Sequence, residues 1–279
     1  MKIVGLVGKQ KLVAVLISVF LLLLLAAAFA QTEKTSWELR VCANEDNLPY
    51  SNRLQQGFEN RVAEILADEL KAKLVYVWLP QPHHPEYEVI LLRGGNCDLF
   101  MGVLDGRDAF ITTEAYYRST YVFVSREDAS YDVHSLDDPL LHRLRLGVVR
   151  ASPPDLALTN RGIVENVHHY FAKDPFSAIT DAVAAEKIDL GIVWGPIAGY
   201  YSKQQLIPLK LTHVTPEVDM PFLPMVLSMS MGVREQDEAL RDLLNRALVI
   251  RWKEIQAILN DYGVPLLQLS PPAISIGSP

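Results

Sequence analysis

The chain has 279 residues, two cysteines, 49% hydrophobic residues and a formal net charge of −7 at pH 7. Nucleic-acid binding needs a basic surface, so the acidic balance argues against that class of partner. A chain of this length can bury one large core or two smaller ones, and domains of about 100 to 150 residues are the commonest size.

The first thirty residues predict an export signal. Lys2, Lys9 and Lys11 precede an uncharged apolar run over residues 12–25, and Ala28-Phe29-Ala30 has the small-residue pattern of a cleavage site. The alternative is an uncleaved membrane anchor, because the run approaches the roughly 20 residues that span a bilayer. The cleavage pattern favours a signal peptide over residues 1–30, and hence a soluble periplasmic protein with no stable membrane insertion.

After the signal, short apolar runs alternate with segments of helical period, which is typical of βαβ units and a mostly parallel sheet. The first helix is the clearest, since Phe58, Val62, Ile65, Leu66 and Leu70 form one apolar stripe. In this first part, strands are predicted at 39–43, 74–79, 97–102 and 121–125, and helices over 58–70 and through 89–92.

The pattern restarts after a charged, Pro-bearing segment at 126–142. Strands are predicted at 144–149, 188–193 and 229–233, and helices over 176–186, 197–203 and 237–262. The apolar face of the last helix must pack against a sheet or another helix, so the chain is expected to cross back to the first part. We therefore predict lobe I from 38–125 plus 217–269, lobe II from 126–216, hinges near Ser125–Arg126 and Thr212–Pro216, and an unstructured tail at 270–279.

The two cysteines are predicted to form a disulfide. Cys42 lies in the first predicted strand and Cys97 at the start of the third, and these strands are neighbours in a doubly wound lobe. An oxidising compartment favours the bridge over free thiols.

Metal and catalytic motifs are not apparent. His83-His84 and His168-His169 are interpreted as surface residues, because adjacent side chains in a strand point apart. Acidic residues at 45–46 and 105–108 could attract a cation, but no regular ligand spacing accompanies them. The sequence lacks a phosphate loop, a Gly-x-Ser-x-Gly elbow and a zinc signature, so no cofactor and no enzymatic activity are predicted.

Several segments resemble the family 3 periplasmic solute-binding proteins. Leu39-Arg-Val-Cys-Ala-Asn, Leu48-Pro-Tyr-Ser-Asn, Gly57-Phe-Glu-Asn-Arg and Val193-Trp-Gly-Pro-Ile-Ala-Gly-Tyr are similar to the accessory "J" branch that accompanies quinoprotein methanol dehydrogenases. The resemblance implies an α/β, two-lobed type II periplasmic-binding-protein fold, each lobe a mostly parallel sheet flanked by helices. It also implies a non-catalytic role in assembly, activation or operation of a PQQ-dependent dehydrogenase. The alternative is a receptor that hands a small solute to an ABC transporter.

The amino-acid clamp of the wider family is altered. In amino-acid-binding relatives an Arg in the first lobe holds the ligand carboxylate, and an Asp after a second-lobe strand holds the amino group. In this sequence Arg107 corresponds only approximately to the carboxylate-binding Arg, and Trp194 occupies the position of the Asp that binds the amino group. A zwitterionic amino acid is therefore not expected as ligand.

The predicted cleft combines aromatic and polar side chains, which suit a flat ligand or an inserted side chain of a partner. Three of these residues have an alternative, structural interpretation. Trp78 could pack within its lobe, Arg118 could hold the lobe interface, and Ser152 could cap a helix rather than form part of an anion site. The predicted set comprises Asn47, Tyr50, Asn52, Trp78, Arg107, Tyr117, Arg118, Ser152 and Trp194.

Overall fold

The computed structural model describes residues 37–79, 85–106, 110–171, 174–219 and 221–272. The predicted signal peptide, His83-His84, Arg107 and Asp108 lie outside these residues, as does most of the predicted tail. Within the described part of the chain, no helix has the length and apolar character needed to cross a membrane.

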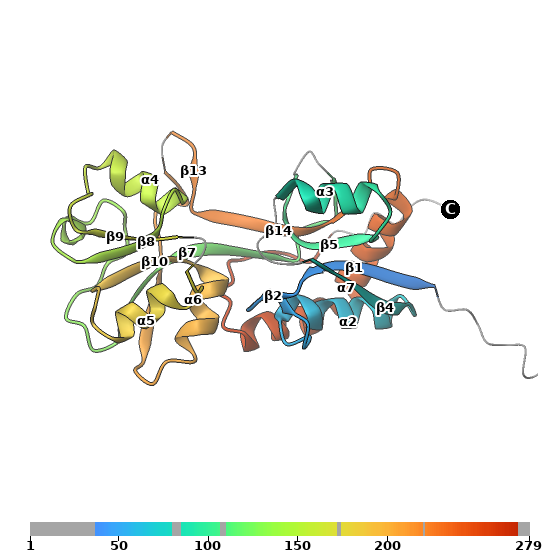
Figure 1. Ribbon diagram of the computed structural model, residues 1–279, viewed down its shortest axis with the longest axis horizontal. Helices are drawn as coiled ribbons and strands as arrows, with labels where there is room; N and C mark the ends of the chain where they lie inside the picture. Colours follow the sequence, from blue (N-terminus) through green and yellow to red (C-terminus); the bar gives the residue numbers. More distant parts are fainter. Residues whose placement is uncertain (1–36, 80–84, 107–109, 172–173, 220, 273–279) are drawn as a thin grey trace, which may run out of the picture. The chain divides into compact units, whose positions relative to one another are not determined.

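A ten-stranded sheet runs through the fold in the order β4-β1-β5-β14-β7-β10-β8-β9, with β6 on β14 and β11 on β7 (Figure 1). Its strands are β1 Glu38–Asn44, β4 Lys73–Leu79, β5 Leu99–Leu104, β6 Ile111–Thr112, β7 Tyr117–Arg126, β8 Leu146–Val149, β9 Val167–Tyr170, β10 Leu190–Trp194, β11 Leu209–His213 and β14 Val226–Val233. Two small ribbons pair β2 Asp46–Asn47 with β3 Ser51–Asn52, and β12 Val218–Asp219 with β13 Leu223–Pro224.

Six α-helices and one 3-10 turn are described. They are α2 Phe58–Glu69, α3 Pro85–Arg93, η1 Pro139–His142, α4 Pro153–Asn160, α5 Ala178–Ala184, α6 Gly195–Ser202 and α7 Glu238–Asp261. The α/β fold class and the strongly periodic elements of the sequence are thereby confirmed. Strands β2, β3, β6, β9, β11, β12 and β13 were not among the predicted elements.

The sheet is parallel at both ends and antiparallel in the middle. Strand β1 pairs in parallel with β4 and β5, and β8 pairs in parallel with β9 and β10. Strand β14 is antiparallel to β5 and β7, and β7 is antiparallel to β10 and β11. Antiparallel pairing arises there because β14 returns along the same path that β7 takes outward.

Apolar residues gather on either side of this crossing. A first core includes Leu39, Phe58, Leu99, Met231 and Leu248, all essentially without solvent exposure, and α7 covers it together with α2. A second core is built around β8 and β10, with Phe123, Leu146, Leu158 and Ile192 among its members. The long last helix thus covers the first part of the chain, as its apolar stripe predicts.

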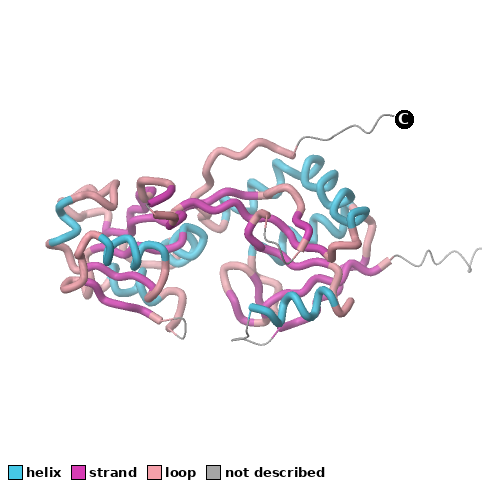
Figure 2. The backbone as a smooth tube through the Cα atoms, turned by 90° about the horizontal axis from the view of Figure 1, so that it is seen from above, coloured by secondary structure: helices cyan, strands magenta, loops and turns pink. Residues whose placement is uncertain are grey.

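The change from first to second core falls within two paired strands, which run side by side in the middle of Figure 2. Tyr117 belongs to the first core and Phe123 to the second, whereas Met225 belongs to the second and Met229 packs on the first. The predicted hinge at Ser125–Arg126 lies beyond the β7 crossing, because those residues already pair with β11. The lobe boundaries themselves stay a prediction.

Helix α6 packs against the C-terminal end of α7 and forms a further link between the two cores. A Cβ on Gly199 would lie 1.8 Å from the Gly263 carbonyl oxygen, so only glycine permits this approach. The Lys203 Nζ donates at 3.1 and 3.0 Å to the carbonyls of the last two residues of α7. Its positive charge thus lies at the negative end of that helix dipole, which is a stabilising arrangement. The Tyr201 hydroxyl donates to the Leu48 carbonyl at 3.1 Å.

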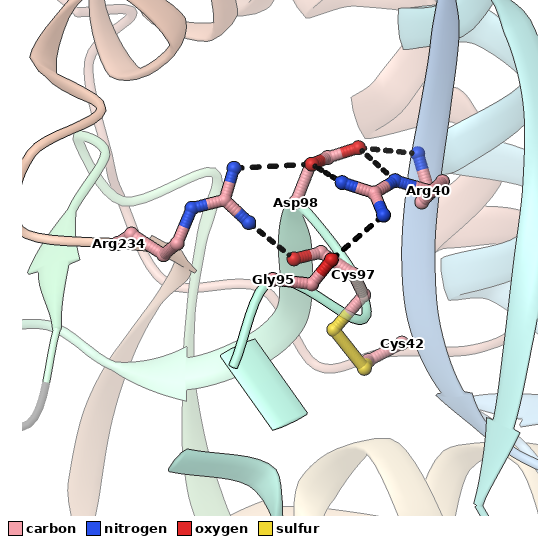
Figure 3. The surroundings of a disulfide bond; sticks show 6 residues. All are labelled: Arg40, Cys42, Gly95, Cys97, Asp98 and Arg234. Carbon is pink, nitrogen blue, oxygen red and sulfur yellow. Dashed lines mark hydrogen bonds and ion pairs between the residues drawn. A yellow bond between two sulfur atoms is a disulfide. The ribbon is translucent and has the colours of Figure 1, made fainter. Parts of the chain in front are cut away.

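The disulfide between Cys42 and Cys97 is present, with the two Cα atoms 5.5 Å apart (Figure 3). It joins β1 to Cys97, two residues before β5, and these strands are parallel neighbours as predicted. Beside it, Asp98 accepts from Arg40 Nη2 at 2.6 Å and from Arg234 Nη2 at 3.1 Å. Burial alone would raise the pKa of Asp98, but the hydrogen bonds from both guanidinium groups more than offset burial and lower it.

Replacing Cys42→Ala together with Cys97→Ala is expected to lower the free energy of unfolding by about 2–4 kcal/mol, because the bridge closes a loop of long sequence separation. Urea denaturation monitored by circular dichroism measures this loss. Reduced wild-type protein is the matched control and should unfold at a similar urea concentration. Equal midpoints for oxidised wild type and the double variant would contradict a stabilising bridge.

Candidate functional site

An apolar pocket of about 360 Å³ opens at the carboxyl ends of β8, β9 and β10. Five aromatic side chains dominate it, and two residues of β14 form the wall toward the first core. Its lining residues are Tyr121, Val149, Ser152, Tyr170, Phe171, Asp174, Pro175, Phe176, Ile179, Ile192, Val193, Trp194, Ile197, Leu227 and Met229.

The order of the strands in the sheet determines where this pocket lies. Val149, Tyr170 and Trp194 are the last residues of three adjacent parallel strands, and ligands of open α/β sheets meet such carboxyl ends. The Trp194 ring contacts the Tyr121 ring edge-on, with the centroids 5.4 Å apart. Burial raises the pKa of Tyr121 to about 12, so its hydroxyl stays neutral over the physiological range.

A second, acidic pocket of about 340 Å³ opens at the carboxyl ends of β1 and β5. Oxygen-bearing side chains enter it from the loop after β1, from α2 and from α3. Its lining residues are Cys42, Ala43, Asn44, Asn47, Tyr50, Glu59, Glu88, Phe100, Met101, Gly102, Val103, Leu104 and Met229.

Glu59 is the carboxyl group of this acidic pocket whose pKa is clearly shifted. Burial raises the pKa of its carboxyl to about 8, and the charge of Glu88 adds to that rise. Gly102, at φ +65°, leaves the space that the carboxyl occupies, since a Cβ there would lie 2.2 Å from Glu59 Oε1. Residue 102 is therefore restricted to glycine both by its backbone angle and by the packing of Glu59.

The two pockets adjoin. Met229 lines both of them, and Tyr50 from the acidic pocket approaches Trp194 from the apolar one. Burial raises the pKa of the Tyr50 hydroxyl, Glu59 and Tyr121 raise it further, and hydrogen bonding by the Trp194 indole acts in the opposite direction. Tyr50 and Trp194, predicted as cleft residues from separate segments, thus lie together.

The remaining predicted cleft residues divide between the pockets and their surroundings. Asn47 lines the acidic pocket and Ser152 the apolar one. Ser152 is the N-cap of α4, where its hydroxyl accepts from the Asp155 amide at 3.5 Å. Arg107 lies outside the described residues.

Four predicted residues line neither of these pockets. Asn52 bonds to Gln56 within its own loop, and Trp78 stacks on the Tyr76 ring with the centroids 4.7 Å apart. Tyr117 is fully buried in the first core, against Phe58 and Tyr116. Arg118 pairs with Glu217 at 2.6 Å beside the strand crossing. That these four residues belong to the functional site remains a prediction.

The aromatic residues that sequence analysis missed share one cause. Tyr170, Phe171 and Phe176 enter the apolar pocket from strand β9 and the segment that follows it. The strand Val167-His-His-Tyr carries two histidines and little apolar pattern, so its carboxyl end was not identified. Glu59 was quoted only as part of a family motif, although a carboxylate next to Phe58, on the apolar stripe of the predicted helix, was a usable signal.

Other candidate ligand groups are engaged elsewhere. Glu45 pairs with Arg53 at 2.6 Å, and His169 lies 2.8 Å from Asp155. In the ranges that the structure covers, no three His, Cys, Asp or Glu side chains are grouped so as to hold a metal ion.

Comparison with known proteins identifies the family. No family model matches the sequence. A protein named MoxJ from Methylorubrum extorquens is 32% identical over 254 residues, which are 83% of this chain and 82% of the relative. The chain belongs to the MoxJ family.

Two solved structures extend the MoxJ relationship to the fold. The periplasmic binding protein XoxJ from Methylobacterium extorquens AM1 is 36% identical, with a TM-score of 0.69 and coverage of 83% of this chain and 100% of that one. MxaJ from Methlophaga aminisulfidivorans MPT is 29% identical, with a TM-score of 0.72 and coverage of 82% and 100%. The predicted periplasmic-binding-protein fold and the "J" branch are confirmed.

Glu59→Gln is expected to flatten the pH dependence of stability of this MoxJ-family protein. The pKa of Glu59 is raised in the folded state, so its contribution is fully present below about pH 4.3, the ordinary Glu value, and is lost as pH rises to about 8. Urea denaturation at pH 5 and pH 9 should show a smaller difference for the variant than for wild type. Glu238→Gln, an exposed substitution on α7, is the control and should keep the wild-type difference; an unchanged difference in Glu59→Gln would refute the raised pKa.

Proposed function

We propose that this chain is exported to the periplasm and acts there, without catalysis of its own, as an accessory protein of a quinoprotein methanol or alcohol dehydrogenase. Its role is in assembly, activation or operation of that enzyme. The relationship to MoxJ, MxaJ and XoxJ over more than four-fifths of the chain carries the proposal. The segment that would direct export is residues 1–30.

The apolar pocket supports contact with a protein partner. Phe171 and Phe176 stand at the pocket with 47% and 40% of their surface exposed, and Val149 with 39%. An apolar concavity bordered by exposed aromatic side chains is the surface that protein interfaces use for anchor residues. A side chain of the dehydrogenase inserted here would bury the Trp194 and Tyr121 rings as well.

The same pocket is poorly suited to a zwitterionic amino acid. Its described lining residues include one carboxylate, Asp174, and no Lys, Arg or His. Trp194 presents an indole at the end of β10 where amino-acid binders present an acid. A ligand carboxylate would have no cationic partner among these residues, and burying it unpaired is costly.

A transport receptor is the second candidate function. Two adjoining concave pockets at the carboxyl ends of strands, each of about the size that small ligands occupy, favour it. Neighbouring genes separate the two functions cheaply: permease and ATPase genes support transport, whereas dehydrogenase and cytochrome c genes support the accessory role.

Phe171→Ala combined with Phe176→Ala is expected to weaken binding to the cognate methanol dehydrogenase at least tenfold, because two exposed anchors are removed from the rim of the pocket. Isothermal calorimetry with the purified apo and holo dehydrogenase measures the dissociation constants. Leu206→Ala is the control, since Leu206 is 99% exposed and does not line this pocket.

Wild-type protein that binds neither form of the dehydrogenase would refute the accessory role. Binding that survives in the double variant would place the interface away from the apolar pocket. A deletion strain with normal dehydrogenase maturation and activity would also contradict the proposal.

A further inference from the structure

The apolar pocket has a polar end, to which the Tyr121 hydroxyl belongs. No described residue forms a hydrogen bond with that hydroxyl. The hydroxyls of Tyr116 and Tyr117 also lack partners but are sealed from solvent, which the Tyr121 hydroxyl is not. Tyr121 lies near enough to Tyr50 to raise the pKa of the Tyr50 hydroxyl, and the Trp194 indole acts on Tyr50 as a hydrogen-bond donor. Two hydroxyls and one indole N–H therefore gather where the two pockets adjoin.

The Tyr121 hydroxyl can both donate and accept a hydrogen bond. Burial raises its pKa to about 12, so the proton stays in place over the physiological range. Polar groups taken out of bulk water are nearly always paired in folded proteins, and an unpaired hydroxyl on a pocket wall therefore marks the place of a partner. Water can fill that place, and a ligand oxygen that makes the same hydrogen bonds displaces the water without loss.

The rest of the pocket offers little to a charged ligand. Among the lining residues that the structure describes, none is Lys, Arg or His, and Asp174 is the one carboxylate. Its Oδ2 atom accepts from the Phe171 amide at 2.8 Å. The Ser152 hydroxyl is engaged as the cap of α4. Burying an ion without a partner is costly, so the pocket favours a neutral group.

The walls of the pocket favour an aromatic group over an aliphatic chain. The Trp194 and Tyr121 rings meet edge-on with their centroids 5.4 Å apart, and three further rings, those of Tyr170, Phe171 and Phe176, complete the lining. Aromatic rings attract one another in edge-to-face and offset-stacked arrangements beyond the effect of buried area. At about 360 Å³ the cavity is at the small end of the range for ligand pockets, which suits a compact ring system.

We propose that the apolar pocket binds an uncharged aromatic ring that carries one hydrogen-bonding oxygen, with the ring against the aromatic wall and the oxygen at the Tyr121 hydroxyl. A phenol is the simplest group of this kind. A free phenol and a tyrosine side chain of a partner protein present the same chemistry. The site itself does not depend on the proposed accessory role, and only the assignment of the ring to a tyrosine of the dehydrogenase rests on that role.

The test is an NMR titration of the chain purified from the periplasm, with 4-cresol as the probe. Toluene, which lacks the oxygen, and the charged compounds 4-methylbenzoate and 4-methylbenzylammonium are the comparison ligands. The cresol is expected to bind about fivefold more tightly than toluene, the size of one net hydrogen bond. It should bind at least about tenfold more tightly than either charged compound, because both would lose hydration without gaining a partner.

A single hydroxyl is expected to carry the preference for cresol. Tyr121→Phe should lower the affinity for cresol about fivefold and leave that for toluene unchanged, whereas a merely structural effect would weaken both. Trp194→Leu removes part of the aromatic wall and should weaken both probes. Tyr200→Phe is the matched control, since the Tyr200 ring stacks on Tyr262 and lines neither pocket.

Equal affinity of the wild type for cresol and toluene, tighter binding of a charged compound, or an unchanged preference for cresol in Tyr121→Phe would each overturn the proposal. A last arm repeats the cresol titration with saturating dehydrogenase. Loss of cresol binding there assigns the ring to a tyrosine of the dehydrogenase, and unchanged binding assigns it to a free phenol; both outcomes retain the site. A dehydrogenase that does not bind the wild type contradicts the accessory role alone, because the cresol titration does not involve it.

Discussion

The antiparallel pairing of β7 with β14 determines where everything else in this protein lies. Residues Tyr117–Thr120 pair with Val226–Met229, and each strand then continues into a different half of the sheet. Because both strands are continuous through the crossing, the two parallel half-sheets share one hydrogen-bonded centre. Their carboxyl ends, where the two pockets open, are therefore held next to each other by backbone pairing.

Contacts outside the sheet reinforce this arrangement. The close approach of Gly199 to Gly263 and the contact of Lys203 with the end of α7 join α6, which lies between β7 and β14 in the chain, to α7, which follows β14. The C-terminal segment adds a third connection, since the Ser119 hydroxyl donates to the Pro265 carbonyl at 2.7 Å and the Leu267 amide to the Arg118 carbonyl at 2.9 Å. An apolar pocket and an acidic pocket fixed side by side suit a ligand or side chain that has both characters.

Much of the fold follows from local sequence pattern, and the site follows only in part. Helices α2 and α7 and strands β1, β4 and β10 were predictable because their apolar residues recur at helical spacing or in short runs between turns. Trp194 was predictable because it ends such a run. Strand β9 was not, since its partner β8 rather than its own polar sequence stabilises it. Pairing partners also set the length of β7, which exceeds the predicted strand at both ends.

The shared position of Met229 gives one side chain an influence on both binding spaces. Its thioether is a soft, adaptable surface between an apolar chamber and an acidic one. Oxidation to the sulfoxide would place a polar S=O dipole at that partition, making the apolar chamber wetter and offering the acidic one an acceptor where it already has a surplus. Oxidising conditions would then act on this protein less through its disulfide, which is already formed, than through a single methionine at the boundary between its two pockets.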